Sequence, residues 1–372
     1  MDDFSALDYF YMARALKLAA KGRFTTAPNP NVGCVLVKDN QIIGEGYHYQ
    51  AGQGHAEVNA MADARANGFA LEGATCYVTL EPCCHYGRTP PCAKALSEAK
   101  VARVVMAMRD PNPKVAGGGK LMLEQAGVNV QSGLLEAQAE QLNPGFLLRM
   151  RLNRPRVRLK TAISLDGRTA LANGQSQWIT GALARSDVQR ERAVSHAILS
   201  TAQTVLADNA SLNVRVNELG SLAELLPVQP RQPIRVIIDR RQLLTGDEPL
   251  FQLPGRVIRV VDRAVAQEVG ETLLVEPAEN WLEQMLFALA KLEINDLWVE
   301  AGATVCGALL SAELVDELII YQAGVTLGDS ARAMLQIAEL TELSKAKRWK
   351  LTTMRQIGQD LKFVYQPQEA IL

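Results

Sequence analysis

The chain has 372 residues, of which 48% are hydrophobic and 21% are charged. This length suffices for two ordinary domains, and the composition is that of a globular protein with a substantial core. The formal net charge is −1, and the first 150 residues carry as many cations as anions. No basic surplus therefore points to a nucleic-acid or membrane-surface partner, and no apolar stretch is long enough to cross a bilayer.

The start of the chain and its cysteines indicate a compartment. Met1-Asp2-Asp3-Phe4 lacks the positive charge and the apolar run of a secretory signal. Three of the six cysteines fall within ten positions, next to His85, which is typical of a metal site in a reducing compartment rather than of a disulfide framework. We therefore expect a cytoplasmic protein. The cysteines are Cys34, Cys76, Cys83, Cys84, Cys92 and Cys306.

The first part of the chain alternates between helical and strand patterns. Ser5 and Asp8 resemble a capping box for a helix over 5–21. Its apolar face is expected to comprise Tyr9, Met12, Ala13 and Leu16. Asp39-Asn40 predicts a hairpin turn. Strands are predicted at 32–37, 41–46, 74–80 and 101–106, and helices at 56–67, 91–99 and 121–126. This alternation predicts an α/β sandwich around a sheet.

A domain boundary is predicted where prolines and five cations gather, between 143 and 158. We expect one domain over 1–150 and a second over 151–372. The second domain repeats an α/β pattern, with helical or loop stretches between its strands. Its strand candidates lie at 157–163, 196–200, 234–238, 257–261, 297–299 and 318–321.

Three fragments carry most of the chemistry: His55-Ala56-Glu57, Glu81-Pro82-Cys83 and Pro90-Pro91-Cys92. A catalytic zinc needs three protein ligands and one open position for water. His55, Cys83 and Cys92 would supply one imidazole and two thiolates. His55 and Cys92 open predicted helices, whose N-termini favour thiolates, and Cys83 follows a predicted strand. The three ligands can therefore converge on one metal ion.

Glu57 lies two residues after His55 and could point into the site without binding the metal. A carboxylate there can take a proton from zinc-bound water and deliver it to a ring nitrogen and to departing ammonia. This arrangement is the one known for zinc deaminases. The sequence thus predicts a zinc-dependent hydrolytic deaminase of an amino-pyrimidine, with Glu57 as its catalytic residue.

Two features of these fragments leave alternatives open. A structural zinc site would close its coordination sphere with a fourth ligand, which Cys84 or His85 could supply, although such a site does not require Glu57. Eight residues separate Cys83 from Cys92, where zinc deaminases usually have two. Within this insertion His85, Arg88 and Thr89 could bind a sugar phosphate, or could belong to a solvated loop.

Several longer motifs accompany the zinc fragments. Pro28-Asn29-Pro30-Asn31-Val32-Gly33 precedes the first strand, and residues 82–92 read Pro-Cys-Cys-His-Tyr-Gly-Arg-Thr-Pro-Pro-Cys. The second half contains Ser164-Leu165-Asp166-Gly167-Arg168-Thr169-Ala170, Ser176-Gln177-Trp178-Ile179-Thr180 and Val299-Glu300-Ala301-Gly302. In these motifs, and over residues 8–365, the chain resembles the bifunctional deaminase–reductase family of riboflavin biosynthesis. The long spacing between the two cysteines is the family's own.

The resemblance implies two consecutive reactions. A 2,5-diamino-6-(5-phosphoribosylamino)pyrimidin-4(3H)-one first loses its 2-amino group by hydrolysis, giving 5-amino-6-(5-phosphoribosylamino)uracil. NADPH then reduces the ribosyl group to give 5-amino-6-(5-phosphoribitylamino)uracil. The implied folds are a cytidine-deaminase-like three-layer sandwich followed by a dihydrofolate-reductase-like domain.

The resemblance also implies site residues. In the deaminase, one zinc per chain would sit on His55, Cys83 and Cys92, with Glu57 as the proton shuttle and Cys84 as a non-ligand. The deaminase substrate would contact Asn29, His48, His85 and Arg88. In the reductase, the implied cofactor contacts are Ala162, Trp178, Thr204, Asp208, Gly302, Ala303, Thr304, Val305, Cys306, Gly307 and Ala308. The implied contacts of the reductase substrate are Ser176, Arg192, Leu212, Arg215 and Glu300.

Read from its residues alone, the second domain lacks the Gly-x-Gly-x-x-Gly of a Rossmann fold. Residues 297–308 predict a strand, a small-residue turn and a helix start. The free N–H groups of that turn could cradle a phosphate, or the segment could be a plain strand-to-helix turn. Trp178, read alone, is more typical of a core residue than of a cofactor contact.

Four charged residues of this domain are candidates for binding or catalysis, and three of them also have a structural reading. Arg192 and Arg215 could clamp the substrate phosphate, or could be solvated charges. Arg240, just after a strand, is a candidate contact for the 2′-phosphate of NADPH. Lys160 could polarise the sugar carbonyl or iminium, or could pair with Glu300.

Two other functions compete with this one. A nucleic-acid deaminase would carry a basic, aromatic-laced surface stripe, which the near-neutral sequence lacks. A non-catalytic interaction protein could use zinc as a structural staple. We expect a small phosphorylated pyrimidine as the substrate and no nucleic-acid or membrane partner. We also expect a homo-oligomer, because α/β enzymes of this kind commonly form symmetric assemblies.

Overall fold

The computed structural model describes residues 4–85, 90–112, 116–225, 230–265 and 268–368. The chain divides into two compact units, Met1–Leu152 and Asn153–Leu372, called the N-terminal and C-terminal units below. The predicted domains meet two residues before this junction. Within the described ranges, no helix combines the length and the apolar character that a membrane span needs.

The N-terminal unit is built on a five-stranded sheet of order β2-β1-β3-β4-β5. Strand β1 pairs antiparallel with β2 and β3, whereas β3, β4 and β5 run parallel. The strands are β1 (Gly33–Lys38), β2 (Gln41–Tyr47), β3 (Thr75–Val78), β4 (Arg103–Met106) and β5 (Asn129–Ser132). The helices are α1 (Ala6–Ala19), η1 (Ala20–Phe24), α2 (Ala56–Ala66), α3 (Cys92–Glu98), α4 (Gly118–Gln125), α5 (Glu136–Leu142) and α6 (Pro144–Leu152).

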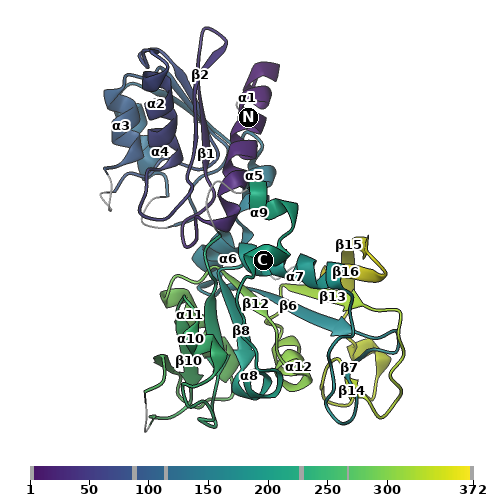
Figure 1. Cartoon of the computed structure of the whole chain (residues 1–372). Helices are drawn as coiled ribbons and strands as arrows, with labels where there is room; N and C mark the ends of the chain where they lie inside the picture. Colours follow the sequence, from purple (N-terminus) through teal and green to yellow (C-terminus); the bar gives the residue numbers. More distant parts are fainter. Residues whose placement is uncertain (1–3, 86–89, 113–115, 226–229, 266–267, 369–372) are drawn as a thin grey trace. The chain divides into compact units, whose positions relative to one another are not determined.

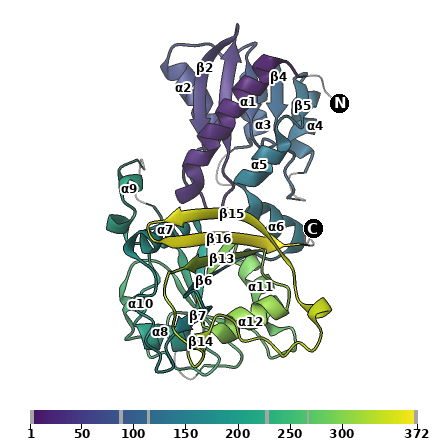
Figure 2. The same cartoon turned by 90° about the vertical axis from the view of Figure 1, so that its right-hand side faces the viewer.

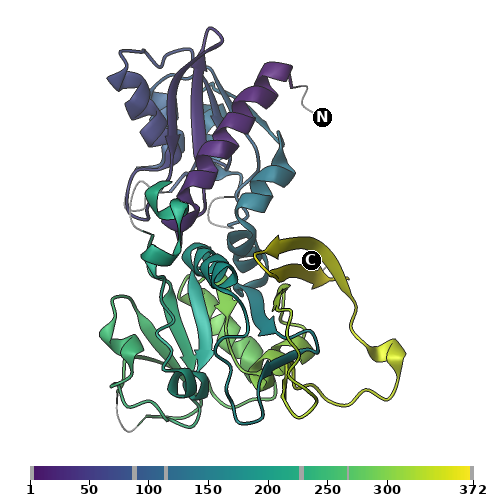
Figure 3. The same cartoon turned by 45° about the vertical axis from the view of Figure 1, so that its right-hand side comes forward.

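Helices cover both faces of this sheet. Helices α2, α3 and α4 pack on one face, where Met61, Leu96 and Leu123 meet the apolar side chains of the strands (Figure 1). Helices α1, α5 and α6 pack on the other face through a second apolar cluster, and α1 crosses the strands obliquely (Figure 3). The predicted three-layer sandwich is confirmed.

Local chemistry explains where these elements begin and end. The capping box of Ser5 and Asp8 is present at the start of α1. Asp39 and Asn40 both have positive φ, 51° and 60°, as expected for a two-residue hairpin turn. The predicted apolar face of α1 was partly wrong, because Tyr9 is 48% exposed. The buried face of the helix instead includes Asp8, Tyr11 and Ala15. The buried Asp8 carboxylate accepts hydrogen bonds from Tyr77 Oη and Arg103 Nη1, both 2.7 Å.

The predicted boundary segment is only partly a linker. Residues Pro144–Leu152 form α6, whose Phe146 and Leu147 are buried against the sheet. A proline is compatible with the first position of a helix, where its missing N–H is not needed. The cations Arg149 and Arg151 then belong to the last turn of that helix, where they favour its C-terminus.

The C-terminal unit holds a nine-stranded sheet of order β11-β10-β9-β8-β12-β6-β13-β16-β15 and a two-stranded sheet of β7 and β14. The strands are β6 (Arg156–Ile163), β7 (Arg168–Ala170), β8 (Ala197–Thr201), β9 (Ile234–Ile238), β10 (Val257–Val261), β11 (Glu271–Leu274), β12 (Asp296–Val299), β13 (Glu317–Gln322), β14 (Arg332–Ala333), β15 (Trp349–Ile357) and β16 (Asp360–Pro367). The helices are α7 (Ala182–Val194), α8 (Ala202–Asp208), η2 (Val216–Glu218), α9 (Ser221–Leu225), α10 (Pro249–Gln252), α11 (Trp281–Lys291), α12 (Ala303–Ser311) and η3 (Leu343–Lys345).

The large sheet is parallel from β11 to β13, and the hairpin β15–β16 extends it antiparallel beyond β13 (Figure 2). Helices α11 and α12 pack on one face, whereas α7, α8 and α10 pack on the other. Because β6, β8, β9 and β12 run parallel, the residues that follow them lie along one edge of the sheet, where α/β folds bind ligands.

Candidate active sites

Three metal-binding side chains meet in the N-terminal unit. His55 is the N-cap of α2, Cys83 follows β3, and Cys92 is the first residue of α3. Their ligand atoms all lie within 4.8 Å of one another. Helix α2 can lie this close to the sheet because Gly46 of β2 has no side chain: a Cβ there would come within 2.5 Å of the Ala56 carbonyl oxygen.

The spacing of these donors fits zinc. His55 Nδ1 lies 3.6 Å from Cys83 Sγ and 3.3 Å from Cys92 Sγ. Tetrahedral zinc with bonds of about 2.05 Å to nitrogen and about 2.3 Å to sulfur would separate such donors by about 3.6 Å. One imidazole and two thiols are also a donor set that zinc prefers. The predicted ligands are therefore brought together as a zinc site requires.

The two thiols differ in their ionisation. The backbone N–H of Cys92 donates to Cys83 Sγ over 3.3 Å. Hydrogen bonding from the Cys92 side chain, followed by that from His55, lowers the pKa of Cys83 to about 4 against the effect of burial. The same pairing, together with burial, raises the pKa of Cys92 above its usual range. These hydrogen bonds favour the thiolate form of Cys83, which is the form that binds zinc.

Glu57 lies in the first turn of α2 and is only 3% exposed. Burial, together with the nearby Cys83, raises the pKa of its carboxyl group to about 7. A carboxyl group with a pKa near 7 can both accept and release a proton.

Among the residues that the structure describes, the metal-binding cluster comprises His55, Cys83 and Cys92, without a fourth side-chain ligand. Cys84 points to the start of α4, where a Cβ on Gly118 would lie 2.6 Å from its Sγ. His85 is exposed. The geometry of these residues favours the open, catalytic reading over the closed, structural one. Arg88 and Thr89 lie outside the described residues.

Two further predicted contacts lie beside the zinc ligands. The rings of His48 and His55 meet edge to face, with centroids 5.3 Å apart. His48 Nδ1 lies 3.0 Å from the Gly54 carbonyl oxygen, which can only accept, so this nitrogen carries the proton. His48 Nε2 then accepts from Asn29 Nδ2 over 2.9 Å. Burial lowers the pKa of His48 and keeps it neutral, so the Asn29 amide is held in one orientation.

In the C-terminal unit, two of the predicted substrate contacts bind each other. Arg192 of α7 donates from Nε and Nη2 to the two carboxylate oxygens of Glu300, over 2.7 and 2.8 Å. Trp298 Nε1 donates to Glu300 Oε1 over 2.7 Å. Trp298 was not predicted from the sequence. Its only signal was its position two residues before Glu300, which places both side chains on one face of an extended chain.

Of the remaining predicted substrate contacts, Leu212 lies in a segment that bonds to this pair. Arg192 Nη1 donates to the Asn213 carbonyl oxygen, which ties the segment with Leu212 to α7. The Leu212 side chain is buried in the core and its φ is 48°, so it would meet a ligand through its backbone. Arg215 is paired with Glu218. Ser176 lies half-buried in the loop before α7.

Lys160 of β6 lies close to this site. Burial lowers the pKa of its ammonium group, while the charge of Glu300 opposes that shift. In turn Glu300 has its pKa held at about 2, because the charge of Arg192, its two hydrogen bonds and Lys160 outweigh the effect of burial. Glu300 is therefore an anion that Lys160 and Arg192 share.

The predicted cofactor turn is the start of α12. Gly302 is its N-cap, and a Cβ there would have no neighbour within 4 Å. The N–H of Cys306 already bonds to Gly302 O, so the N–H groups left for a phosphate belong to Ala303, Thr304 and Val305. Cys306 and Gly307 are buried and Ala308 lies a turn further on. Within the predicted stretch, the free backbone N–H groups that a phosphate could use therefore lie in the first turn of α12.

The other predicted cofactor contacts belong to β6, to the helix after β8 and to loops after other strands. Ala162 lies near the end of β6, and Thr204 and Asp208 belong to α8, which follows β8. Arg240 follows β9; its Nε pairs with Asp262 over 2.8 Å and its guanidinium lies over the Trp281 ring. Trp178 is 67% exposed, with Arg185 over its ring, so it is not a core residue.

Comparison with known proteins agrees with the division into two domains. Residues 6–108 match the cytidine and deoxycytidylate deaminase zinc-binding region, and residues 155–363 match the RibD C-terminal domain. The riboflavin biosynthesis protein RibD of Haemophilus influenzae is 52% identical over 373 residues, which cover 99% of each chain. That of Escherichia coli is 51% identical over 361 residues, 95% of this chain and 98% of its own.

Solved structures give the same result. Acinetobacter baumannii RibD has a TM-score of 0.88 at 45% identity, covering 98% of this chain and 99% of its own. A Thermotoga maritima protein described as a diaminohydroxyphosphoribosylaminopyrimidine deaminase/5-amino-6-(5-phosphoribosylamino)uracil reductase has a TM-score of 0.84 at 34% identity, covering 97% and 99%. These matches confirm the predicted succession of a cytidine-deaminase-like and a dihydrofolate-reductase-like fold. The chain therefore belongs to the RibD family of bifunctional deaminase–reductases in riboflavin biosynthesis.

Proposed function

We propose that the N-terminal unit deaminates 2,5-diamino-6-(5-phosphoribosylamino)pyrimidin-4(3H)-one by hydrolysis, and that the C-terminal unit reduces the ribosyl group of the product with NADPH. The observation that carries the proposal is the cluster of His55, Cys83 and Cys92 with the buried Glu57 beside it. The family to which the chain belongs combines the same two activities.

In the deaminase, zinc on His55, Cys83 and Cys92 supplies Lewis acidity that activates water at neutral pH. Glu57 would take a proton from the attacking water and give it to the ring nitrogen. It would then move a second proton from the added hydroxyl group to the departing amino group, which leaves as ammonia. Asn29, held by the neutral His48, offers its amide to the pyrimidine. The protein residues thereby orient the ring and carry the protons.

In the reductase, NADPH supplies the hydride. The first turn of α12 and Arg240 would bind the phosphates of the dinucleotide, since free backbone N–H groups and guanidinium groups both suit phosphate. Glu300 would accept hydrogen bonds from the hydroxyl groups of the sugar. Lys160, which lies close to Glu300, would donate a proton to the sugar oxygen as the hydride arrives.

The test is a two-step assay on the purified chain loaded with zinc. The diaminopyrimidinone phosphate should release ammonia, and NADPH should then be oxidised in step. Glu57→Gln should lower ammonia release by a factor of about 10²–10⁴ while leaving zinc content and NADPH oxidation with authentic deaminated substrate unchanged. Normal ammonia release by this variant would overturn the role of Glu57. A failure to oxidise NADPH with that substrate would remove the second activity.

We further propose a phosphorylated pyrimidine rather than nucleic acid as the substrate, a cytoplasmic location and a homo-oligomeric state. The near-neutral charge supports the first, and six cysteines without a disulfide support the second. The edge strand β15, whose side chains are mostly exposed, offers backbone groups that a second copy could pair with. Light scattering at several protein concentrations tests the last point, and a monomer throughout would contradict it.

A further inference from the structure

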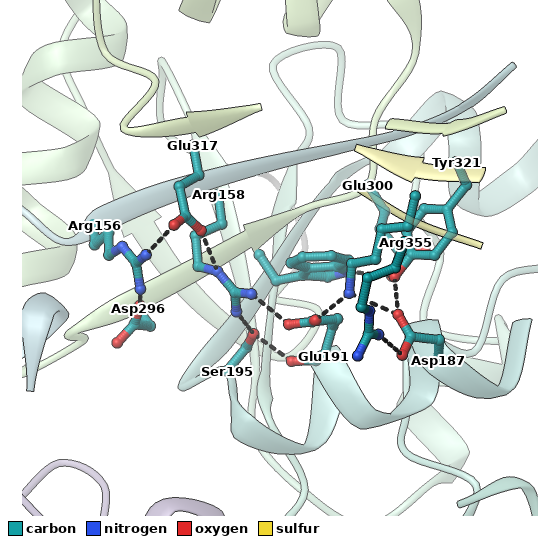
Figure 4. Close-up of polar contacts among 12 residues, drawn as sticks. Arg156, Arg158, Asp187, Glu191, Ser195, Asp296, Glu300, Glu317, Tyr321 and Arg355 are labelled. Atoms are coloured by element: carbon teal, nitrogen blue, oxygen red, sulfur yellow. Dashed lines mark hydrogen bonds and ion pairs between the residues drawn. The ribbon is translucent and has the colours of Figure 1, made fainter. Parts of the chain in front are cut away.

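A network of buried charges joins α7 to one face of the large sheet (Figure 4). Asp187 and Glu191 of α7 both bind Lys362 of β16, over 2.6 and 2.5 Å. Tyr321 Oη donates to Asp187 over 2.7 Å. The network continues along the sheet through Arg156, Arg158, Asp296 and Glu317. Neither proposed reaction uses these side chains.

One member of this network, Arg158, contacts both Glu191, which precedes Arg192, and Trp298, which binds Glu300. It is 9% exposed and lies on β6, facing α7. Its Nη2 pairs with Glu191 and its Nε lies 3.2 Å from Glu317. Its guanidinium also lies over the Trp298 ring, 5.0 Å from the centroid. One side chain thus contacts a helix, a neighbouring strand and a buried indole.

Two of these contacts lead directly to Glu300. Glu191 is followed in α7 by Arg192, which binds both carboxylate oxygens of Glu300. Trp298 donates its indole N–H to Glu300 Oε1. Arg158 therefore supports both groups that hold the Glu300 carboxylate, one through the helix backbone and one through the face of the indole.

We propose that Arg158 is a positioning residue of the reductase: it fixes the Glu300 carboxylate for the sugar by anchoring Glu191 and by stacking on Trp298. This inference rests on the proposed role of Glu300 as a substrate contact. A planar guanidinium can make both contacts together, because its edge forms ion pairs while its face lies on an aromatic ring.

Arg156 provides a matched control. It lies two residues earlier on β6 and also pairs with Glu317, over 2.5 Å. Its other partner is Asp296, at 3.5 Å. Replacing Arg156 removes the same charge from the same network, but the ion-pair partners of Arg156 are Asp296 and Glu317, whereas Glu191 and Trp298 contact Arg158. A difference in reductase kinetics between variants at the two positions therefore shows whether the contacts of Arg158 with Glu191 and Trp298 affect Glu300.

The experiment compares Arg158→Gln with Arg156→Gln in the full chain, with the deaminase rate as an internal measure of intact protein. We expect both to lower the thermal unfolding midpoint, and Arg158→Gln alone to lower reductase kcat/KM by about tenfold or more. The loss should appear mainly in KM for the pyrimidine, because a substrate contact is misplaced. Equal reductase parameters for the two variants would overturn the inference.

A second pair of variants keeps the test decisive if Arg158→Gln does not fold. Trp298→Phe keeps the aromatic face for Arg158 and removes only the N–H bond to Glu300, so KM should rise while stability changes little. An unchanged KM would show that the Trp298 hydrogen bond does not position Glu300.

In a Glu300→Gln background, Arg158→Gln should cause no further rise in KM, because the effects of coupled residues are not additive. If Glu300→Gln alone leaves the reductase intact, the proposed role of Glu300 fails instead.

Discussion

Arg192 and Glu300 are joined by two hydrogen bonds of 2.7 and 2.8 Å, and the remaining Nη1 of Arg192 donates to Asn213 O. Three of the five N–H donors of the guanidinium are therefore bound within the protein, and Glu300 balances its charge. This pairing favours Arg192 as the group that holds Glu300. Its role as a clamp for the substrate phosphate stays a prediction.

Replacing Arg192 tests this relationship. Arg192→Gln would leave the Glu300 carboxylate buried without its main partner, which typically costs about 3–5 kcal/mol of folding free energy. We expect reductase activity to be lost and deaminase activity to persist. Chemical denaturation and both assays measure this. Arg190→Gln, at an exposed position on the same helix, is the control. A loss confined to the affinity for substrate phosphate would restore the clamp reading.

The ionisation of Glu300 makes stability depend on pH. Its pKa is about 2 in the folded chain, below the ordinary value of 4.5. A carboxyl group with a depressed pKa stabilises the fold above its unfolded pKa, and this contribution disappears as the pH falls toward 2. The difference in unfolding free energy between the wild type and Glu300→Gln should be roughly 3 kcal/mol at pH 7 and should shrink between pH 4.5 and 2.

Urea denaturation at several pH values measures this difference. A difference that stays constant over that range would show that Glu300 is not held as an anion by Arg192 and Lys160. Glu218→Gln is a suitable comparison, because this carboxylate also pairs with an arginine, Arg215, but at the surface. Exposed pairs contribute only about 0–1 kcal/mol, so this variant should show little pH dependence of its own.

The zinc site could be predicted from the sequence because its chemistry is carried by three short motifs. Only certain residue types bind zinc, and His55, Cys83 and Cys92 stand at helix starts and a strand end that a local pattern reveals. The contacts around Glu300 could not be predicted in this way. Arg192, Trp298 and Glu300 are brought together by packing of α7 on the sheet, across about 100 residues of sequence.

The charged network shows a signal that was misread. Arg156, Arg158 and Lys160 alternate along β6, which places all three on one face of the strand. In the sequence, Arg156 and Arg158 belong to the cluster of cations that predicts a domain boundary, because prolines and other arginines precede them. Their partner carboxylates come from α7 and β13, and no local pattern in the sequence pairs cations with anions so far apart.

Exchanging single cysteines tests the open zinc site. Cys83→Ser should lower zinc content and abolish ammonia release, because a hydroxyl is a much weaker zinc ligand than a thiolate. Cys84→Ser should keep both, since its sulfur lies against the start of α4 and outside the ligand cluster. Metal analysis and the ammonia assay measure the outcome. Zinc loss on Cys84→Ser would favour the closed, structural reading.

Variants of two glycines, one at the N-cap of α12 and one within the helix, can distinguish an effect on cofactor binding from an effect on folding. Gly307 is in close contact with the segment at Gln336, and a Cβ would lie 1.9 Å from the Gln336 carbonyl oxygen. Gly307→Ala should therefore destabilise the C-terminal unit, since crowding in packed regions typically costs about 1–3 kcal/mol. Gly302 has a φ of −71° and open space around its Cα, so Gly302→Ala should fold normally.

If the first turn of α12 binds the dinucleotide phosphates, the added methyl of Gly302→Ala should weaken NADPH binding while thermal stability stays the same. Fluorescence titration with NADPH and thermal unfolding separate the two effects. Gly307→Ala should show the opposite order, with lower stability and, in the fraction that remains folded, nearly normal NADPH affinity. Unchanged NADPH affinity in Gly302→Ala would place the phosphates away from this turn, because a methyl group at the helix N-cap stands directly beside the N–H groups of Ala303 and Thr304.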